Sequence, residues 1–247
     1  MQEKTTNLLG LGISIALGLV ISSSIVSYTL NRVSNNKQSV VVKGLAEKQV
    51  TADQARWSVV VSGDGKTLAG AFAAMRANRP QVLRFFQEQG FSDKQIEAGR
   101  EVFDIEYRMD KQGRPTNEIE RYFARQALAL SSDEVRRVDQ AVGKIVTLQE
   151  KGLPLEVSNP EYLVSTLEKV KMSLIADATR NAHDRANEFA RTGDAKVGAM
   201  KSANQGAFYI LPAQGGSNDA EYGGVYDKTT IEKLARVVVT IEYALTQ

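Results

Sequence analysis

The chain has 247 residues, of which 31 are Lys or Arg and 29 are Asp or Glu, and 43% are hydrophobic. A net charge of +2 does not provide the clustered basic face typical of nucleic-acid binding, so no nucleic-acid partner is expected. Because the chain has no cysteine and one histidine, disulfides, thiolate metal ligands and a multi-histidine metal site are excluded, and we expect no metal and no cofactor.

Residues 8–30 form a run of 23 residues without a charge. As a helix this run would be about 34 Å long, enough to cross the apolar core of a bilayer. A cleaved signal peptide and a buried core helix are the alternatives, although a signal peptide usually has an apolar run of only about 7–15 residues. We therefore expect a tail over residues 1–7, a transmembrane anchor over 8–30, a tether over 31–38 and a folded body over 39–247.

Small residues recur at every fourth position within the predicted anchor. They are Gly10, Ser14, Gly18 and Ser22. A stripe of this kind lets two helices approach closely in lipid, which favours self-association, but Gly and Ser are also common in membrane helices that do not associate.

The first half of the body alternates strand-like and helix-like segments. Hydrophobic periodicity predicts strands at Ser39–Lys43 and Gln49–Ser62, a helix at Thr67–Gln89 and a hairpin of Ile96–Arg108 with Ile119–Leu130. We expect turns at Gly44 and at Gly63–Gly65. Pro80 should kink the helix or break it after Asn78.

The second half of the body predicts two helices, several strands and one long loop. Helices are expected at Asp133–Gln149 and Glu168–Arg191, and strands at Leu155–Ser165 (interrupted by Pro160), Val197–Ala203, Ala207–Leu211 and Leu234–Leu245. In the second helix an alanine stripe suits close packing: Ala178, Ala182, Ala186 and Ala190. The whole order predicts an α+β body in which helices pack on a mixed, mostly antiparallel sheet.

Few residues suggest chemistry. His183 is expected to be an exposed side chain on a polar helix face, Trp57 to be a core residue, and Gly63–Lys66 to be a strand-to-helix turn because it lacks the spacing of a phosphate-binding loop. Asp104 and Glu106 could bind a cation together with Asp110, but cross-strand pairing with arginines is the expected arrangement. We therefore predict no catalytic residues.

A Gly-rich loop at Pro212–Lys228 is the other feature of interest. Its tyrosines could form an interface in an assembly, or the loop could be an ordinary surface loop. The three tyrosines in question are Tyr209, Tyr222 and Tyr226.

The start of the body, Val40–Ala55, reads VVVKGLAEKQVTADQA. This segment resembles the opening of the SIMPL-domain (DUF541) family, with Gly44, Glu47 and Asp53 in place and Ala52 where proline is usual. Further matches follow in order along the chain: Gly90, Asp93, Ile96, Gly152, Arg185, Ala186, Ala190, Gly193 and Gly198. The resemblance covers nearly the whole body.

The resemblance implies an exported bacterial protein of the cell envelope without established catalytic residues. It also implies ring- or channel-like homo-oligomers and a link to stress tolerance. We expect a bacterial inner-membrane protein whose body lies in the periplasm and whose partners are the bilayer and further copies of itself. Alternatives are an envelope ligand-binding module or hydrolase that uses carboxylates and arginines, and a body that faces the cytoplasm, as Lys/Arg counts beside residues 8–30 favour.

Overall fold

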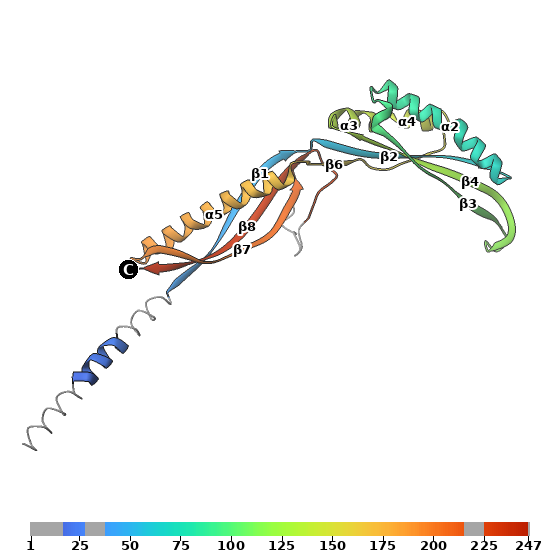
Figure 1. The fold of residues 1–247 in the computed structure, drawn as a ribbon. Coiled ribbons are helices and arrows are strands. Elements are labelled where there is room, and N and C mark those ends of the chain that lie inside the picture. Colours follow the sequence, from blue (N-terminus) through green and yellow to red (C-terminus); the bar gives the residue numbers. More distant parts are fainter. Residues whose placement is uncertain (1–16, 28–37, 215–224, 247) are drawn as a thin grey trace, which may run out of the picture. The chain divides into compact units, whose positions relative to one another are not determined.

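A computed structural model describes residues 17–27, 38–214 and 225–246 of the chain. The body confirms the expected α+β class, with antiparallel sheets and packed helices (Figure 1). After a helical segment at residues 17–27, the strands and helices follow in the order β1 (Ser39–Thr51), β2 (Gln54–Gly65), α2 (Leu68–Glu88), β3 (Ile96–Met109), β4 (Pro115–Ser132), α3 (Val135–Lys144), α4 (Val146–Glu150), β5 (Leu155–Val157), β6 (Glu161–Leu163), α5 (Leu167–Thr192), β7 (Lys196–Pro212) and β8 (Glu232–Thr246).

The body divides into two compact units, and each unit contains several separate stretches of chain. The first unit takes the described residues up to Glu47, then Lys171–Phe208 and the residues from Arg236 onward. The second unit takes Lys48–Val170 and Tyr209–Ala235.

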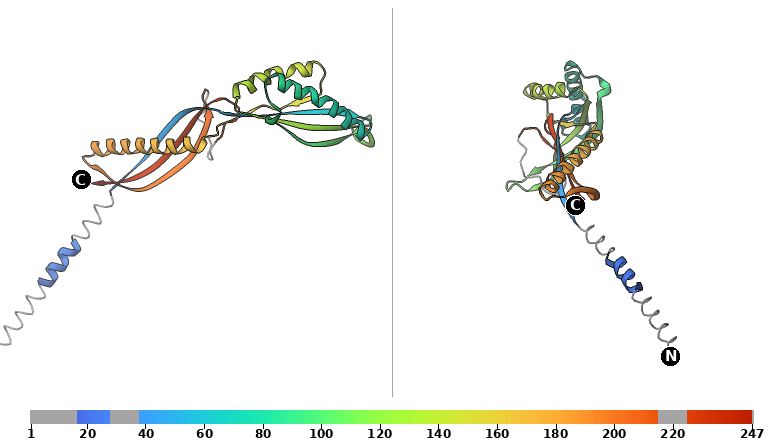
Figure 2. Two further views of the ribbon diagram at one scale, coloured as in Figure 1. Left: turned by 45° about the horizontal axis from the view of Figure 1, so that its top comes forward. Right: turned by 90° about the vertical axis from the view of Figure 1, so that its left-hand side faces the viewer.

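The first unit packs α5 on a three-stranded sheet with the order β1-β8-β7 (Figures 1 and 2). The backbone N–H of Leu245 bonds to Gln38 at one end of the β1–β8 pair, and Arg236 bonds to Glu47 near the other, so these strands run antiparallel. The predicted alanine stripe of α5 is the buried face of this helix, and its four alanines are at most 4% exposed.

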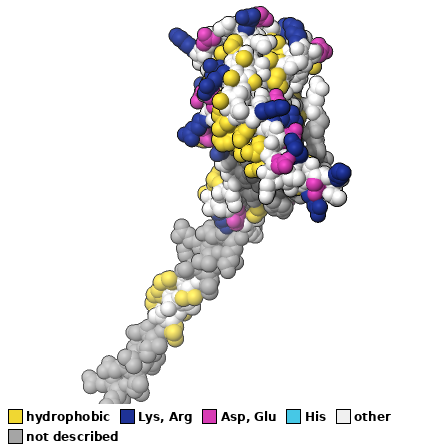
Figure 3. Space-filling model, turned by 90° about the vertical axis from the view of Figure 1, so that its right-hand side faces the viewer, with side chains coloured by type: hydrophobic (Ala, Val, Ile, Leu, Met, Phe, Trp, Pro, Cys, Tyr) yellow, Lys and Arg dark blue, Asp and Glu magenta, His cyan; other side chains and the backbone are white. Residues whose placement is uncertain are grey.

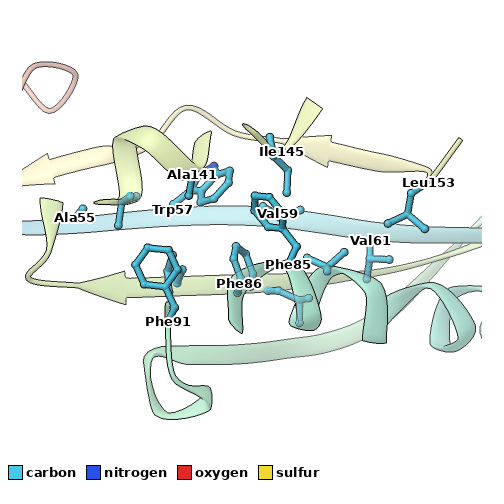
Figure 4. Packing of buried hydrophobic residues seen from close by; sticks show 14 of the residues in the cluster. Ala55, Trp57, Val59, Val61, Phe85, Phe86, Phe91, Ala141, Ile145 and Leu153 are labelled. Atoms are coloured by element: carbon cyan, nitrogen blue, oxygen red, sulfur yellow. The ribbon is translucent and has the colours of Figure 1, made fainter. Parts of the chain in front are cut away.

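The second unit contains a five-stranded sheet with the order β3-β4-β2-β5, in which β6 also pairs with β2. Helices α2 and α3 pack on this sheet and close a core around Trp57 (Figure 4). Trp57 is 2% exposed, meets the ring of Phe86 edge-on at 5.6 Å and donates its indole N–H to the carbonyl of Ser158 at 3.0 Å. The predicted core role of Trp57 is therefore confirmed.

The two predicted glycine turns are wrong, because both glycines lie within strands beneath a helix. At Gly44 in β1, an added Cβ would lie 2.0 Å from the carbonyl oxygen of Ala178 in α5. At Gly63 in β2, it would lie 2.2 Å from the backbone nitrogen of Met75 in α2. These positions need glycine for close helix–sheet approach and not for a turn, so each strand continues past it.

Helix α2 also continues through Pro80, so of the two predicted effects of this proline, a kink or a break, the break after Asn78 is wrong. The helix buries residues on both sides of the proline, including Met75 and Phe86. Their burial offsets the loss of one backbone hydrogen bond at Pro80. Four other boundaries differ. The predicted strand at 49–62 is divided between β1 and β2 at residues 52–53, and the predicted helix at 133–149 is two helices. The strand at 155–165 is two short strands, and the two strands at 197–211 are one continuous strand, β7.

Candidate functional site

The outer part of the β3–β4 hairpin exposes large apolar side chains. We call this set the hairpin surface, and its members are Phe103 (48% exposed), Ile105 (36%), Tyr107 (42%) and Ile119 (42%). Tyr107 lies directly opposite Ile119 in the strand pairing, while Ile105 lies opposite the half-buried Tyr122. The four side chains therefore form neighbouring rows across two strands, as cross-strand partners do.

The hairpin surface is a continuation of the core face of the sheet. Phe103 pairs with Ala124, whose side chain is fully buried, and directly paired residues of antiparallel strands point to the same face. Helix α2 covers this face over β2 and β4 but begins only at Leu68. Within the described part of the second unit no helix extends the cover, so an apolar face meets solvent.

Arg76 marks the border between the covered core and the hairpin surface. The ring of Phe72 in α2 meets Phe103 at 6.3 Å, and the Arg76 guanidinium lies 5.5 Å from the Phe72 ring. Arg76 also binds Glu101 in β3, with a shortest N–O distance of 2.6 Å. The hydrogen bond from Arg76 lowers the pKa of Glu101, so this carboxylate stays ionised at the border.

The opposite face of the hairpin carries a ladder of ion pairs. Glu106 binds Arg121 at 2.5 Å, and Asp104 binds Arg125. Asp110 accepts a hydrogen bond from Arg114 in the hairpin turn at 2.9 Å. The predicted cross-strand pairing of Asp104 and Glu106 with arginines is confirmed. Among the described residues, no group of acidic or histidine side chains is arranged to hold a metal ion.

The charges around the hairpin surface are of both signs. Residues 101–125 contain six acidic and five basic side chains. Figure 3 shows hydrophobic side chains gathered at this end of the unit, with Lys, Arg, Asp and Glu around them. A mixed, nearly neutral rim does not match a nucleic acid or an anionic lipid surface, but it does suit a protein surface of similar composition.

The second unit also has an open cavity of about 400 Å³, lined by residues of α3, β6 and the segment before β8. On one side Arg136 binds Glu232 at 3.1 Å, and Glu232 also accepts a hydrogen bond from Thr51 at 2.7 Å. On the other side the buried Tyr162 donates to Asp139 at 2.7 Å. Burial, helped by the hydrogen bond to Asp139, raises the pKa of Tyr162, so its hydroxyl is a donor at neutral pH.

The predicted tyrosine loop is described only in part. Tyr209 is half-buried, and the hydroxyl of Tyr226 accepts a hydrogen bond from the backbone N–H of Val164 at 3.0 Å. Tyr226 also bridges to Ile210. Tyr222 lies outside the described residues. The Tyr226 hydroxyl is thus used within its own unit, and its role at an interface stays a prediction.

A buried ion pair joins Asp227, near the end of this loop, to Lys233 in β8. The ammonium of Lys233, which is 0% exposed, donates to the backbone carbonyl and the carboxylate of Asp227 at 2.6 and 3.3 Å. The same carboxylate accepts hydrogen bonds from the backbone and hydroxyl of Thr229, both at 2.8 Å, and from Thr230. These partners satisfy both charges and fix the chain where it enters β8.

Of the predicted anchor, the structure describes residues 17–27, which are helical and exposed. Gly18 and Ser22 belong to this helix, whereas Gly10 and Ser14 lie outside the described residues. No helix in the described part of the chain is long and apolar enough to span a bilayer. His183 is exposed, as predicted, and its ring meets the ring of Tyr243 at 5.5 Å.

Sequence reasoning identified the β3–β4 hairpin but not its exposed surface. The alternation of Phe103, Ile105 and Tyr107 along β3 is the pattern of one apolar face. The available signal was the single helix Thr67–Gln89 before the hairpin, which is too short to cover the outer half of strands 14 and 18 residues long. No motif or periodic pattern in the sequence marks the residues that line the cavity near Arg136.

A family model for the SIMPL proteins, described as proteins of unknown function (DUF541), matches residues 40–242. No curated protein matches the chain. Among solved structures, an uncharacterized conserved protein from Listeria innocua is 12% identical, covering 78% of this chain and 91% of that chain with a TM-score of 0.16. Because the family model spans most of the chain, the protein belongs to the SIMPL (DUF541) family.

Proposed function

We propose that this chain is a membrane-anchored protein of the bacterial cell envelope whose body self-assembles into a ring-, cage- or channel-like homo-oligomer with a role in stress tolerance. The observation that carries the proposal is the hairpin surface, where Phe103, Ile105, Tyr107 and Ile119 are between 36% and 48% exposed. Contiguous apolar side chains with a polar rim are typical of protein interfaces. The charge-free run at residues 8–30 supports the anchor.

A second copy of the chain is the partner that the surface fits best. In a symmetric interface each surface meets its own copy, so a rim with both signs of charge can find complementary partners on its twin. Arginine, tyrosine and phenylalanine, which are enriched in interfaces, are all present around this surface, at Arg76, Tyr107 and Phe103.

The test is the mass of the full-length protein in detergent, measured by native mass spectrometry. The wild type is expected to be an oligomer. The double variant Ile105→Lys/Tyr107→Lys is expected to form smaller assemblies, because lysine on an exposed strand opposes association. The matched control is Val102→Lys, since Val102 is 51% exposed on the opposite face of the same strand. A monomeric wild type, or equal loss of mass in the control, contradicts the proposal.

A ligand-binding or hydrolytic role is the second candidate, and the cavity near Arg136 favours it. A volume of about 400 Å³ falls within the range of small-molecule sites. The measurement is the melting temperature of the full-length protein with panels of small amines, carboxylates and phosphate. A compound that stabilises the wild type but not the Asp139→Asn variant supports this role, and the absence of any such compound removes it.

A further inference from the structure

Strand β7 of the first unit is exposed along most of its length. Residues 199–206 are all exposed, whereas strand β1, at the other edge of the same sheet, buries every second residue at Val42, Gly44 and Ala46. A strand that is held on one edge only, with both faces open to solvent, gains little from packing. Pairing with an additional strand would supply the stabilisation that β7 does not gain from packing.

The two edge strands of the sheet differ in whether their outward backbone groups have hydrogen-bond partners. On β1 the backbone N–H of Leu45 donates to Asn181 of α5, and the carbonyl of Lys43 accepts from Arg185 of α5, both at 3.1 Å. These side chains satisfy groups that would otherwise be open to pairing with another strand. On β7 no further strand pairs with residues 199–206 within the described ranges.

The stretch also carries few of the features that protect an edge. It reads AMKSANQG, with one charge, at Lys201, and no proline. Natural edge strands are commonly blocked by several charges, by proline or by a bulge, so this edge remains a template for β-pairing.

We propose that residues 198–206 of β7 pair antiparallel with residues 198–206 of a second copy of this chain, with Ser202 on the two-fold axis. Identical strands that meet around a two-fold axis must run antiparallel. In this register Gly198 lies opposite Gly206, and Lys201 lies opposite Ala203, so no two like charges face each other directly. The pairing joins two three-stranded sheets into one continuous sheet.

This inference rests on the proposed self-assembly and adds a second contact to it. The hairpin surface belongs to the second unit and the β7 edge to the first. A chain with two different self-complementary surfaces can form assemblies larger than a dimer, because a contact through one surface leaves the other surface of each copy free to bind a further copy.

The test uses the absence of native cysteine, which makes single-cysteine variants unambiguous. In the full-length protein in detergent, Ser202→Cys is expected to form a covalent dimer under mild oxidation, because directly paired residues of antiparallel strands lie about 4.5–5.5 Å apart at Cα, within the range of a disulfide. The matched control is Val41→Cys, which is 62% exposed on the other edge strand and is expected to stay monomeric on a non-reducing gel.

The result separates this inference from the proposed function. If the wild type is an oligomer but Ser202→Cys gives no more dimer than Val41→Cys, the β7 contact is wrong and the self-assembly stands. If Ser202→Cys still cross-links in the Ile105→Lys/Tyr107→Lys background, the β7 contact is independent of the hairpin surface.

Hydrogen exchange provides a second measurement without any substitution. Amides of residues 199–206 in the assembled wild type are expected to exchange about tenfold more slowly than in protein diluted to monomer, because pairing protects the outward N–H groups. Equal exchange rates in the two samples would overturn the proposal.

Discussion

At the residue scale, the pair of Lys233 and Asp227 is the most heavily buried charge arrangement described in the chain. Both side chains are at most 7% exposed. Burial alone disfavours each charge, and for Lys233 it lowers the pKa despite the attraction of Asp227. The pair is tolerated because the Lys233 ammonium and both oxygens of the Asp227 carboxylate have hydrogen-bond partners, including the two threonine hydroxyls.

Replacing Lys233 by methionine should destabilise the second unit by about 3–5 kcal/mol, because Asp227 would remain as a buried charge without its cation. Urea unfolding followed by fluorescence measures this directly, since Trp57 is the single tryptophan and lies in the core of that unit. Lys228→Met is the control. Lys228 is half exposed in its pair with Glu161, so its loss should cost at most about 1 kcal/mol.

Acid should weaken the second unit through Asp227. Burial raises the pKa of this carboxyl, but hydrogen bonds from Thr230 and Thr229 and the charge of Lys233 outweigh it and bring the pKa to about 2, below the ordinary 3.8. A lowered folded-state pKa stabilises the fold above about pH 4, and this contribution of about 2 kcal/mol is lost as the pH falls toward 2. Asp227→Asn should therefore flatten the fall in unfolding free energy over this range.

At the element scale, both units use the same device to bring a long helix close to a sheet. A strand glycine lies beneath the helix backbone: Gly44 beneath Ala178 in the first unit and Gly63 beneath Met75 in the second. The distances leave no room for a Cβ, so the helix axis would have to move away from the strand if either glycine were replaced.

Gly63→Ala should destabilise the second unit by about 1–3 kcal/mol or more, because the new methyl group would collide with the backbone of α2. Gly143→Ala is the matched control. Gly143 lies in α3 with nothing within 4 Å of an added Cβ, so alanine should stabilise the helix by about 0.5–1 kcal/mol. Denaturant unfolding followed by Trp57 fluorescence compares the two, and similar effects of both variants would contradict this account.

These glycines also show where prediction from the sequence reached its limit. Periodicity located every helix and strand of the body except the exact breaks, because burial of one face is a local pattern. At Gly44 and Gly63 the sequence wrongly predicts turns, because it does not show which element packs above a residue. The hairpin surface was missed for a similar reason: the alternation around Phe103 predicts an apolar face, but whether a helix covers that face depends on a distant part of the chain.

At the scale of the whole molecule, the sequence combines a charge-free run with a charge-balanced body in two compact units. The proposed anchor and the two proposed self-association surfaces would act in the same direction. Tethering copies to one membrane confines them to a layer, which raises their effective concentration and favours weak contacts that would fail between freely diffusing chains.

Deleting residues 8–30 should move the protein from the membrane fraction to the soluble fraction, because the body carries no comparable apolar run. The full chain should stay with the membranes after an alkaline wash, and its mass should include residues 1–30. A mature protein that lacks these residues would instead establish a cleaved signal peptide.

A reporter that works only in the periplasm should be active when it is fused to the C-terminus of this chain. This outcome would place the body outside the cytoplasm, against the count of Lys and Arg beside residues 8–30. Activity of a reporter that works only in the cytoplasm would reverse the orientation.

The position of β8 at the centre of the β1-β8-β7 sheet determines when the first unit can be completed. Because β8 follows both β1 and β7 in the chain, these two strands remain without their shared neighbour until residues 232–246 have been synthesised. The core of the second unit is encoded earlier and can close first. If the body is exported unfolded, as the proposed function requires, the first unit can close only after β8 has crossed the membrane and lies beside β1 and β7.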